Sequence, residues 1–326
     1  MRAIRLHEFG PASNLRYESV PDPEPAAGQV RIAVAASGVH LVDTTMRRGE
    51  PGPFPVAELP TIPGREVAGT VDRVGAGVDP ALLGRAVVTH LGAAPGGYAE
   101  LAVADADRLL DIPDGVSPAT AVAMLGTGRT TLGILLFTEL DPNSVAVVTA
   151  AAGGIGTLLV QYARSVGATV IGLAGGPAKM DLVAANGADL AVDYTAADWP
   201  DTVRAHLGGR TATHVFDGVG DPIATTAVDL LGPGGTHLSY GWAGGTATAL
   251  DPAVLAARGV TSVPVLGPPM LERAGGDLLT LSRRAIALAA DGVLTPARTE
   301  FPLSDTAAAH AALESRATTG KVVLIP

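Results

Sequence analysis

The chain of 326 residues contains no cysteine. This absence excludes disulfides, thiolate catalysis, and zinc or iron–sulfur sites built on cysteine ligands. Aromatic residues are also scarce, at 4% of the chain. Small aliphatic side chains must therefore fill most of the core.

Positive charge and long apolar runs are scarce as well. Lys and Arg number 22 against 32 Asp and Glu, the formal net charge is −10, and no basic run exceeds a pair. This pattern disfavours nucleic acid and anionic membrane surfaces as partners. No stretch approaches the ~20 apolar residues that span a bilayer, and residues 1–8 lack the apolar core of a secretory signal. We therefore expect a soluble cytoplasmic protein.

The residues that are present predict a compact globule with two kinds of region. Hydrophobic residues make up 47% and charged residues 17%, a composition typical of folded domains. In the first ~115 residues, short strands over 30–34, 67–74 and 85–89 alternate with Pro- and Gly-rich turns. This spacing predicts a β-rich, barrel-like region.

The pattern changes near Ser117 and Pro118, where helical periodicity begins to alternate with short apolar runs. Strands are predicted over 144–150, 169–174, 190–192, 214–216, 236–240 and 261–265. Helices are predicted between them, over 155–166, 179–186, 200–207, 222–231 and 252–258. Six strands joined by five crossovers predict a doubly wound parallel sheet. Two further helices (275–291 and 304–316) and a strand (321–325) follow.

The strongest local motif lies between the first of these strands and its helix. In Ala151-Ala152-Gly153-Gly154-Ile155-Gly156, the first, third and sixth residues occupy the positions of a G-x-G-x-x-G fingerprint. Gly153 lets the backbone approach a pyrophosphate, and Gly156 lets helix and strand pack closely. Free N–H groups at the helix start then bind the phosphates. We expect Ala152, Gly153, Gly154, Ile155 and Gly156 to bind a dinucleotide; a simple turn is the alternative.

The residues after the second strand favour NADPH over NADH. An NAD site usually places an acidic residue ~20 residues beyond the glycines, but residues 173–180 contain none before Asp181. Lys179 can instead neutralise a 2′-phosphate. The alternative interpretation of Lys179 is a solvated residue in a helical first turn.

Seven segments, taken in order, resemble the quinone oxidoreductase branch of the medium-chain dehydrogenase/reductase superfamily. They are residues 36–43, 63–69, 96–100, 150–156, 216–220, 239–241 and 313–321. The resemblance implies an α/β protein with a GroES-like catalytic domain, formed by residues 1–117 and 267–326. A Rossmann NADPH-binding domain would span residues 118–266. It also implies a homodimer paired through the segment 259–263.

The resemblance also bears on metal binding. Zinc-dependent relatives hold a catalytic metal at positions that correspond here to His40, Arg65 and Gly126. One imidazole, one cation and one glycine cannot form a tetrahedral zinc site. We therefore expect zinc-independent chemistry.

Four residues are candidates for catalysis. His40 could donate a proton, since histidine exchanges protons near neutral pH, or it could only pack in the cleft. Asp43 could orient His40 or, with more weight, cap a helix that starts at Thr44. Thr127 matches a family threonine near the nicotinamide. Arg129 could bind an anionic or carbonyl group, although a salt-bridged hinge residue is the favoured interpretation.

Further cofactor contacts are implied by the resemblance alone. Gly175 and Lys179 match the 2′-phosphate loop, and Tyr194 matches an aromatic residue beside the adenosine phosphate. The remaining implied contacts lie in the matching segments or frame the nicotinamide: Val219, Gly220, Ser239, Tyr240, Gly241, Trp242, Pro264, Val265, Leu266 and Lys321.

The implied reaction is hydride transfer from NADPH to a quinone or an α,β-unsaturated carbonyl compound, without a metal. Family tyrosines on the substrate side are replaced by Thr45, Met46 and Pro51. A secondary-metabolism tailoring reductase or cyclase acting on a polyketide-like substrate is therefore one alternative. A non-catalytic NADPH-binding protein is another.

Overall fold

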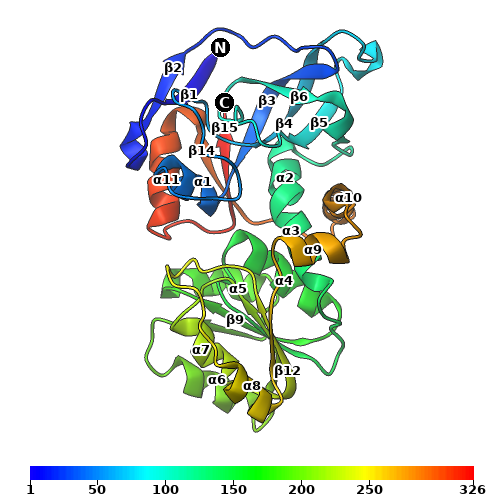
Figure 1. Cartoon of the computed structure of the whole chain (residues 1–326). Coiled ribbons are helices and arrows are strands. Elements are labelled where there is room, and N and C mark those ends of the chain that lie inside the picture. Colours follow the sequence, from blue (N-terminus) through cyan, green and yellow to red (C-terminus); the bar gives the residue numbers. More distant parts are fainter. The chain divides into compact units, whose positions relative to one another are not determined.

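The computed structural model describes all 326 residues, which form two compact units (Figure 1). The first unit comprises Met1–Gly128 and Ser282–Pro326, and the second comprises Arg129–Leu281. The sequence suggested domain boundaries after residues 117 and 266. The first division between the units falls 11 residues later than expected, and the second falls 15 residues later. Helix α2 (Pro118–Ala123) packs against strands of the first unit, whereas α9 (Pro268–Arg273) packs against α3 (Arg129–Leu135) in the second.

The first unit is built on a seven-stranded sheet, as the β-rich pattern predicted. The strand order is β14-β15-β3-β4-β5-β7, and β6 also pairs with β3. The strands are β3 (Gln29–Val39), β4 (Glu66–Val74), β5 (Ala86–His90), β6 (Leu101–Asp105), β7 (Leu110–Asp111), β14 (Arg298–Pro302) and β15 (Lys321–Ile325). A separate pair joins β1 (Arg2–Leu6) to β2 (Leu15–Ser19). The return of the C-terminal strand to this unit is confirmed, because β15 runs antiparallel to β3.

Short helices complete the first unit. They are α1 (Leu41–Arg47), α2, the π-helical turn η4 (Met124–Gly128) and α11 (Thr306–Glu314), with 3₁₀ turns η1 (Ala12–Asn14), η2 (Pro80–Leu82), η3 (Ala106–Arg108) and η6 (Leu303–Asp305). Helix α10 (Leu278–Ala290) spans the second division between the units. Helix α11 packs on α1 and β15, over a core that includes Ile4, Tyr98 and Leu324.

The second unit is a six-stranded parallel sheet in the order β10-β9-β8-β11-β12-β13. The strands are β8 (Val145–Val148), β9 (Thr169–Ala174), β10 (Leu190–Asp193), β11 (Ala212–Asp217), β12 (Leu231–Ser239) and β13 (Thr261–Pro264). The chain starts in the centre, moves outward to β10, and then returns to build the other half from β11 to β13. This is the doubly wound order that the alternating pattern predicted.

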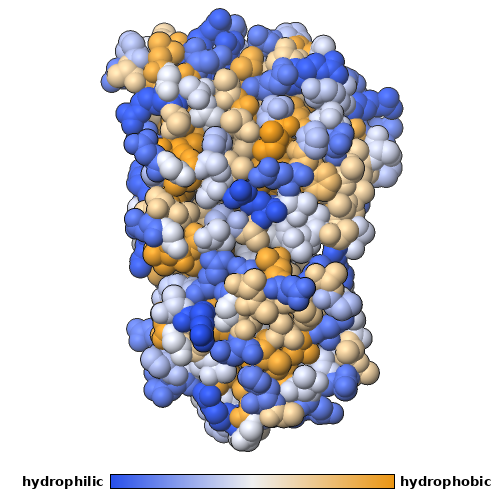
Figure 2. All heavy atoms as spheres, turned by 180° about the vertical axis from the view of Figure 1, so that it is seen from behind, coloured by the Kyte–Doolittle hydropathy of each residue, from blue (hydrophilic) through white to orange (hydrophobic).

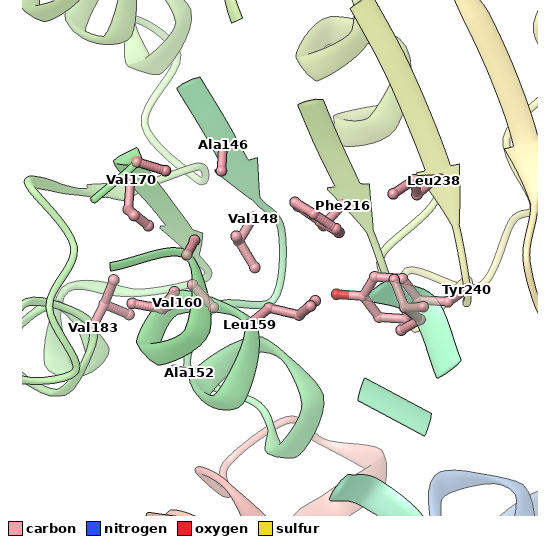
Figure 3. Packing of buried hydrophobic residues seen from close by; sticks show 14 of the residues in the cluster. Ala146, Val148, Ala152, Leu159, Val160, Val170, Val183, Phe216, Leu238 and Tyr240 are labelled. Carbon is pink, nitrogen blue, oxygen red and sulfur yellow. The ribbon is translucent and has the colours of Figure 1, made fainter. Parts of the chain in front are cut away.

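Helices cover both faces of this sheet. They are α3, α4 (Gly154–Ser165), α5 (Met180–Ala185), α6 (Trp199–Leu207), α7 (Ile223–Val228), α8 (Pro252–Arg258) and α9, with the 3₁₀ turn η5 (Pro177–Lys179). Ala146 and Val148 point into one core and Val145 and Val147 into the other, because alternate residues of a strand face opposite sides. Figure 3 shows the first core, where Leu159 of α4 packs beside Val148. The helix predicted over 222–231 is shorter, since Leu231 already begins β12.

None of the helices is long and apolar enough to cross a membrane. On the face shown in Figure 2, hydrophilic and hydrophobic residues are interspersed in small groups. Among the large apolar side chains that remain exposed are Trp242 and Leu266.

Candidate functional site

The glycine-rich loop connects the central strand β8 to helix α4. Ala150 adopts a left-handed conformation (φ 49°), and its carbonyl accepts the N–H of Gly153 at 2.8 Å. A side chain at Gly156 would place its Cβ 2.2 Å from that carbonyl oxygen, so only glycine allows α4 to start this close to the strand. The 12-residue helix α4 therefore begins directly at the loop. Its first-turn N–H groups lack intrahelical partners and suit a pyrophosphate.

The loop after β9 brings together two residues expected at the adenosine end of the cofactor. A Cβ at Gly175 would lie 3.0 Å from the hydroxyl oxygen of Tyr194, so the two residues are neighbours. Lys179 closes the 3₁₀ turn that follows. Gly175 and Lys179 thus belong to one loop, and Tyr194 lies beside Gly175.

Asp193 was not identified from the sequence, although it shapes the same loop. Its Oδ1 accepts the backbone N–H groups of Gly176 at 2.8 Å and Thr195 at 2.9 Å. These hydrogen bonds hold the pKa of Asp193 below its usual range. An Asp two residues before a Thr at a strand end is a signal for such a turn.

The segments expected around the nicotinamide are organised by a buried carboxylate at the end of β11. Oδ1 of Asp217 accepts the N–H groups of Val219 at 3.0 Å and Gly220 at 3.1 Å. Its Oδ2 lies 3.4 Å from Nε2 of the buried His237. Burial raises the pKa of Asp217, but the hydrogen bonds from His237 and the backbone outweigh it, so the net shift is downward. The loop is thus fixed by an ionised Asp217.

The side chains of the other residues expected near the nicotinamide differ in their exposure to solvent. Tyr240 packs into the core beside α4 (Figure 3), and Val265 belongs to the same core. Trp242 and Leu266, in contrast, are exposed. For Tyr240, burial raises the pKa far above its ordinary value, and the hydroxyl lies 3.5 Å from the carbonyl of Thr149. Only the backbone of Tyr240 and Val265 therefore remains to contact a cofactor.

In the first unit, His40 belongs to a three-residue cluster. Its Nε2 lies 2.7 Å from Oε2 of Glu66 and 2.7 Å from Nζ of Lys321. Nζ of Lys321 also donates to Oε2 of Glu66 at 3.1 Å. The side chains of Glu66 and Lys321 are 1% and 4% exposed, whereas that of His40 is 35% exposed. We refer to His40, Glu66 and Lys321 as the His–Glu–Lys cluster.

Two glycines make room for the cluster. A Cβ at Gly126 would lie 1.9 Å from Oε1 of Glu66 and 3.2 Å from Cε1 of His40. A Cβ at Gly38 would lie 2.7 Å from Oε2 of Glu66 and 3.1 Å from Cε of Lys321. Gly126 belongs to the π-helical turn η4, a kind of turn that often occurs at functional sites.

The positions that hold zinc in zinc-dependent relatives do not converge on a metal site here. Gly126 lies beside His40, but the guanidinium of Arg65 stacks on Phe54 at 4.4 Å instead. No group of three or more potential ligand side chains is present. Around His40 the chain offers one imidazole and one carboxylate, with the ammonium of Lys321 bonded to both. This donor set does not fit a catalytic zinc ion.

Asp43 caps a helix, as the sequence suggested, although it does so as the third residue of the helix in a capping box with His40. Helix α1 begins at Leu41 rather than Thr44, so Asp43 lies in its first turn. Its Oδ2 accepts the backbone N–H of His40 at 2.8 Å and the hydroxyl of Tyr98 at 3.0 Å. Asp43 thus fixes the backbone of His40, not its imidazole. Burial, together with the nearby charge of Asp43, raises the pKa of Tyr98.

The remaining expected residues are placed as follows. Thr127 is buried in η4, next to Gly126. Arg129 begins α3 and is half-buried. No salt bridge is present to support the interpretation of Arg129 as a salt-bridged hinge residue. Lys321 was expected at the cofactor, but its ammonium is engaged by His40 and Glu66.

A GroES-like unit combined with a doubly wound parallel sheet defines the medium-chain dehydrogenase class of folds. The alcohol dehydrogenase GroES-like domain family matches residues 26–114. The zinc-binding dehydrogenase family matches residues 154–271, a region that contains none of the three positions compared with zinc ligands.

Individual proteins that are similar to this chain identify its branch within this class of folds. A quinone oxidoreductase of Pseudomonas aeruginosa is 31% identical over 100% of this chain and 99% of its own. A 2-haloacrylate reductase of a Burkholderia species is 32% identical over 99% of this chain and 98% of its own. The solved structure of Escherichia coli quinone oxidoreductase complexed with NADPH has a TM-score of 0.85 and 29% identity, with complete coverage of both chains. The chain therefore belongs to the zinc-independent quinone oxidoreductase branch of the medium-chain dehydrogenase/reductase superfamily.

Proposed function

We propose that this protein is an NADPH-dependent, zinc-independent reductase of quinones or α,β-unsaturated carbonyl compounds. The observation that carries the proposal is the glycine-shaped loop between β8 and α4, present in a chain that matches NADPH-complexed quinone oxidoreductase over its full length. The 2-haloacrylate reductase among its relatives adds activated alkenes to the substrate classes to be tested.

The second unit supplies the cofactor site. Backbone N–H groups of residues 154–156, at the start of α4, would hold the pyrophosphate, and Lys179 with Gly175 would receive the 2′-phosphate beside Tyr194. NADPH, when bound, supplies the hydride. Residues 173–180 include no acidic side chain to bind the free 2′-hydroxyl of NADH, and the carboxylate of Asp193 is already held by the N–H groups of Gly176 and Thr195. We therefore expect the loop to favour the 2′-phosphate.

The first unit supplies the proton. Nε2 of His40 lies 2.7 Å from both a donor, Lys321, and an acceptor, Glu66. A protonated Nε2 donates to Glu66, and a deprotonated Nε2 accepts from Lys321, so either state of His40 keeps a hydrogen-bond partner. His40 can therefore release a proton and regain one from solvent without leaving a buried group unpaired.

The reaction then balances with one hydride and one proton. An enone gains hydride at its β-carbon, and the alkene electron pair moves toward the carbonyl to form an enolate. His40 protonates this enolate, and solvent restores the proton on His40. We propose that Thr127 and Arg129 stabilise the developing oxyanion and that Asp43 positions His40 through its backbone.

The direct test is steady-state NADPH oxidation with a panel of benzoquinones, naphthoquinones and enones, repeated with NADH. We expect turnover with NADPH and a preference for it over NADH. Lys179→Ala should raise KM for NADPH by roughly tenfold and leave KM for NADH unchanged. Arg164→Ala is the matched control, since it removes an exposed cation paired with Asp189.

A failure would take two distinct forms. Tight NADPH binding without oxidation across the panel would favour a non-catalytic NADPH-binding protein. An NADPH preference that Lys179→Ala does not change would remove Lys179 from the site. A polyketide-like substrate, a cytoplasmic location and a homodimer stay predictions.

A further inference from the structure

A hollow in the first unit is lined by Arg65, the residue that precedes Glu66 of the His–Glu–Lys cluster in the chain. It lies between α1, the segment 50–65 and Pro95; its cavity volume is about 30 Å³, and the rest of the hollow is open to solvent. Its walls are mostly apolar and include Met46, Phe54 and Val56. Asp43, which holds the backbone of His40, also lines it. The enclosed part has room for a small polar group, and the rest of a bound molecule would lie on the open side.

Arg65 is the unusual residue in this hollow. It is only 7% exposed, and its Nε has no hydrogen-bond partner. Its polar contacts are weak: Nη1 lies 3.7 Å from Sδ of Met46, and Nη2 lies 3.5 Å from the carbonyl oxygen of Ala93. One face of the guanidinium stacks on Phe54. Burial lowers the pKa of Arg65, as expected for a cation that lacks close compensation.

The other charged groups around the hollow each have a salt bridge or close hydrogen bonds, although Nε and Nη1 of Arg47 lack a partner. Arg47 pairs with Glu314, and Glu50 pairs with Arg48. The carboxylate of Asp43 accepts two hydrogen bonds, from the backbone of His40 and from Tyr98. Asp43 attracts Arg65 electrostatically, but no salt bridge joins the two. The hollow therefore contains a buried guanidinium whose hydrogen-bonding fork is largely unused.

We propose that Arg65 binds the carboxylate of an acidic acceptor, so that the preferred substrates are α,β-unsaturated carbonyl compounds bearing a carboxylate. The proposal rests on the reductase function proposed above. A guanidinium presents parallel donors that match a carboxylate, and a bound carboxylate would compensate its buried charge. The apolar walls at Met46, Phe54 and Val56 would hold the carbon skeleton. Neutral quinones would leave Arg65 without such a partner.

The test uses two acceptors that share one enone, 4-oxo-4-phenylbut-2-enoic acid and its methyl ester. Arg65→Met keeps a long side chain and removes the charge. We expect it to lower kcat/KM for the acid by about tenfold to a hundredfold and to leave that for the ester within about twofold. Arg65→Lys should retain part of the activity on the acid. Comparing each acceptor between wild type and variant removes the difference in intrinsic reactivity.

Arg73→Met is the matched control, because Arg73 is an exposed cation on β4, the strand that begins directly after Arg65. It should change neither acceptor. Equal losses on acid and ester, or no loss on either, in Arg65→Met would overturn the assignment of Arg65.

The proposed reductase function and the proposed role of Arg65 can be disproved independently of each other. If wild type oxidises no NADPH with either acceptor, the proposed reductase function loses its support. Calorimetric binding of the acid to wild type and Arg65→Met then decides the role of Arg65. Binding at least tenfold weaker in Arg65→Met supports the carboxylate site, and equal binding or none to wild type overturns it.

Discussion

Single residues decide whether the His–Glu–Lys cluster can form. The carboxylate of Glu66 fits between β3 and η4 only because residues 38 and 126 lack side chains. The ammonium of Lys321 compensates the buried charge of Glu66. In a zinc-dependent relative, a metal ion would lie near this position. Removing one member of such a buried set leaves the others uncompensated.

Gly126→Ala should impair catalysis by displacing Glu66. The added methyl group would lie 1.9 Å from Oε1 of Glu66, so the carboxylate must move away from His40. We expect kcat/KM for the acceptor to fall by about a hundredfold, within the range contributed by general acids, and the pH profile to change. KM for NADPH should stay unchanged.

Gly128→Ala provides the control in the same turn. Its methyl group would approach side-chain atoms of Met124 and Ala285 at 2.9 Å rather than the carboxylate. Similar losses in both variants would show that crowding of η4, not displacement of Glu66, is responsible.

How much of the site was predictable from the sequence depends on the distance between its parts along the chain. The phosphate loop was predicted because its glycines, strand and helix are contiguous. The pairing of Glu66 with Lys321 was not, since 255 residues separate them and neither segment signals the other. The start of α1 was also misplaced, because an acid in a first turn and an acid that precedes a helix give similar patterns.

At the scale of elements, helix α11 carries a histidine that links stability to pH. His310 is fully buried, neither ring nitrogen has a hydrogen-bond partner, and the ring packs edge-on against Tyr98. Burial lowers the pKa of His310 to about 4. Because an unfolded histidine titrates near pH 6.5, only the unfolded chain takes up this proton as the pH falls from about 6.5 to about 4.

His310 should therefore destabilise the fold in acid. The shift corresponds to about 3 kcal/mol of unfolding free energy, which is fully available above pH 6.5 and lost by pH 4. His310→Phe should flatten the dependence of Tm on pH in this window, measured by calorimetry. His206→Gln changes an exposed histidine of α6 and should leave the dependence unaltered. An unchanged slope in His310→Phe would contradict the assignment.

The division into two units depends on tertiary packing, which local sequence patterns do not predict. The helical periodicity of α2 and α9 is visible in the sequence, but the strand or helix that each one covers is not. Their packing moved both boundaries into what had been expected as the neighbouring domain. The sheet order of the second unit, by contrast, follows from strand–helix alternation and the handedness of crossovers.

At the scale of the whole molecule, the edge strand β13 bears on assembly. Thr261–Pro264 pairs only with β12, so its outer side is open to a second copy. We expect light scattering to give twice the 32.7 kDa of one chain. Thr261→Lys, which places two like charges near the two-fold axis, should shift the protein toward monomer.

The opposite edge of the sheet provides the control for assembly. Ala197→Lys adds the same charge at an exposed position beyond β10 and should leave the mass unchanged. A monomeric wild type, or a dimer insensitive to Thr261→Lys, would contradict pairing through β13.

The crossing of β15 back to β3 also sets an order of events during synthesis. Residues 129–281 are complete before Lys321 has been added to the chain, so the dinucleotide-binding unit can fold while the first unit still lacks a strand. Until β15 arrives, β3 lacks its neighbour on one side along Ser37, Gly38 and Val39, and Glu66 does not have the ammonium of Lys321 beside it. The unit with the proposed cofactor site can thus fold before the surroundings of the proposed proton donor, His40, are complete.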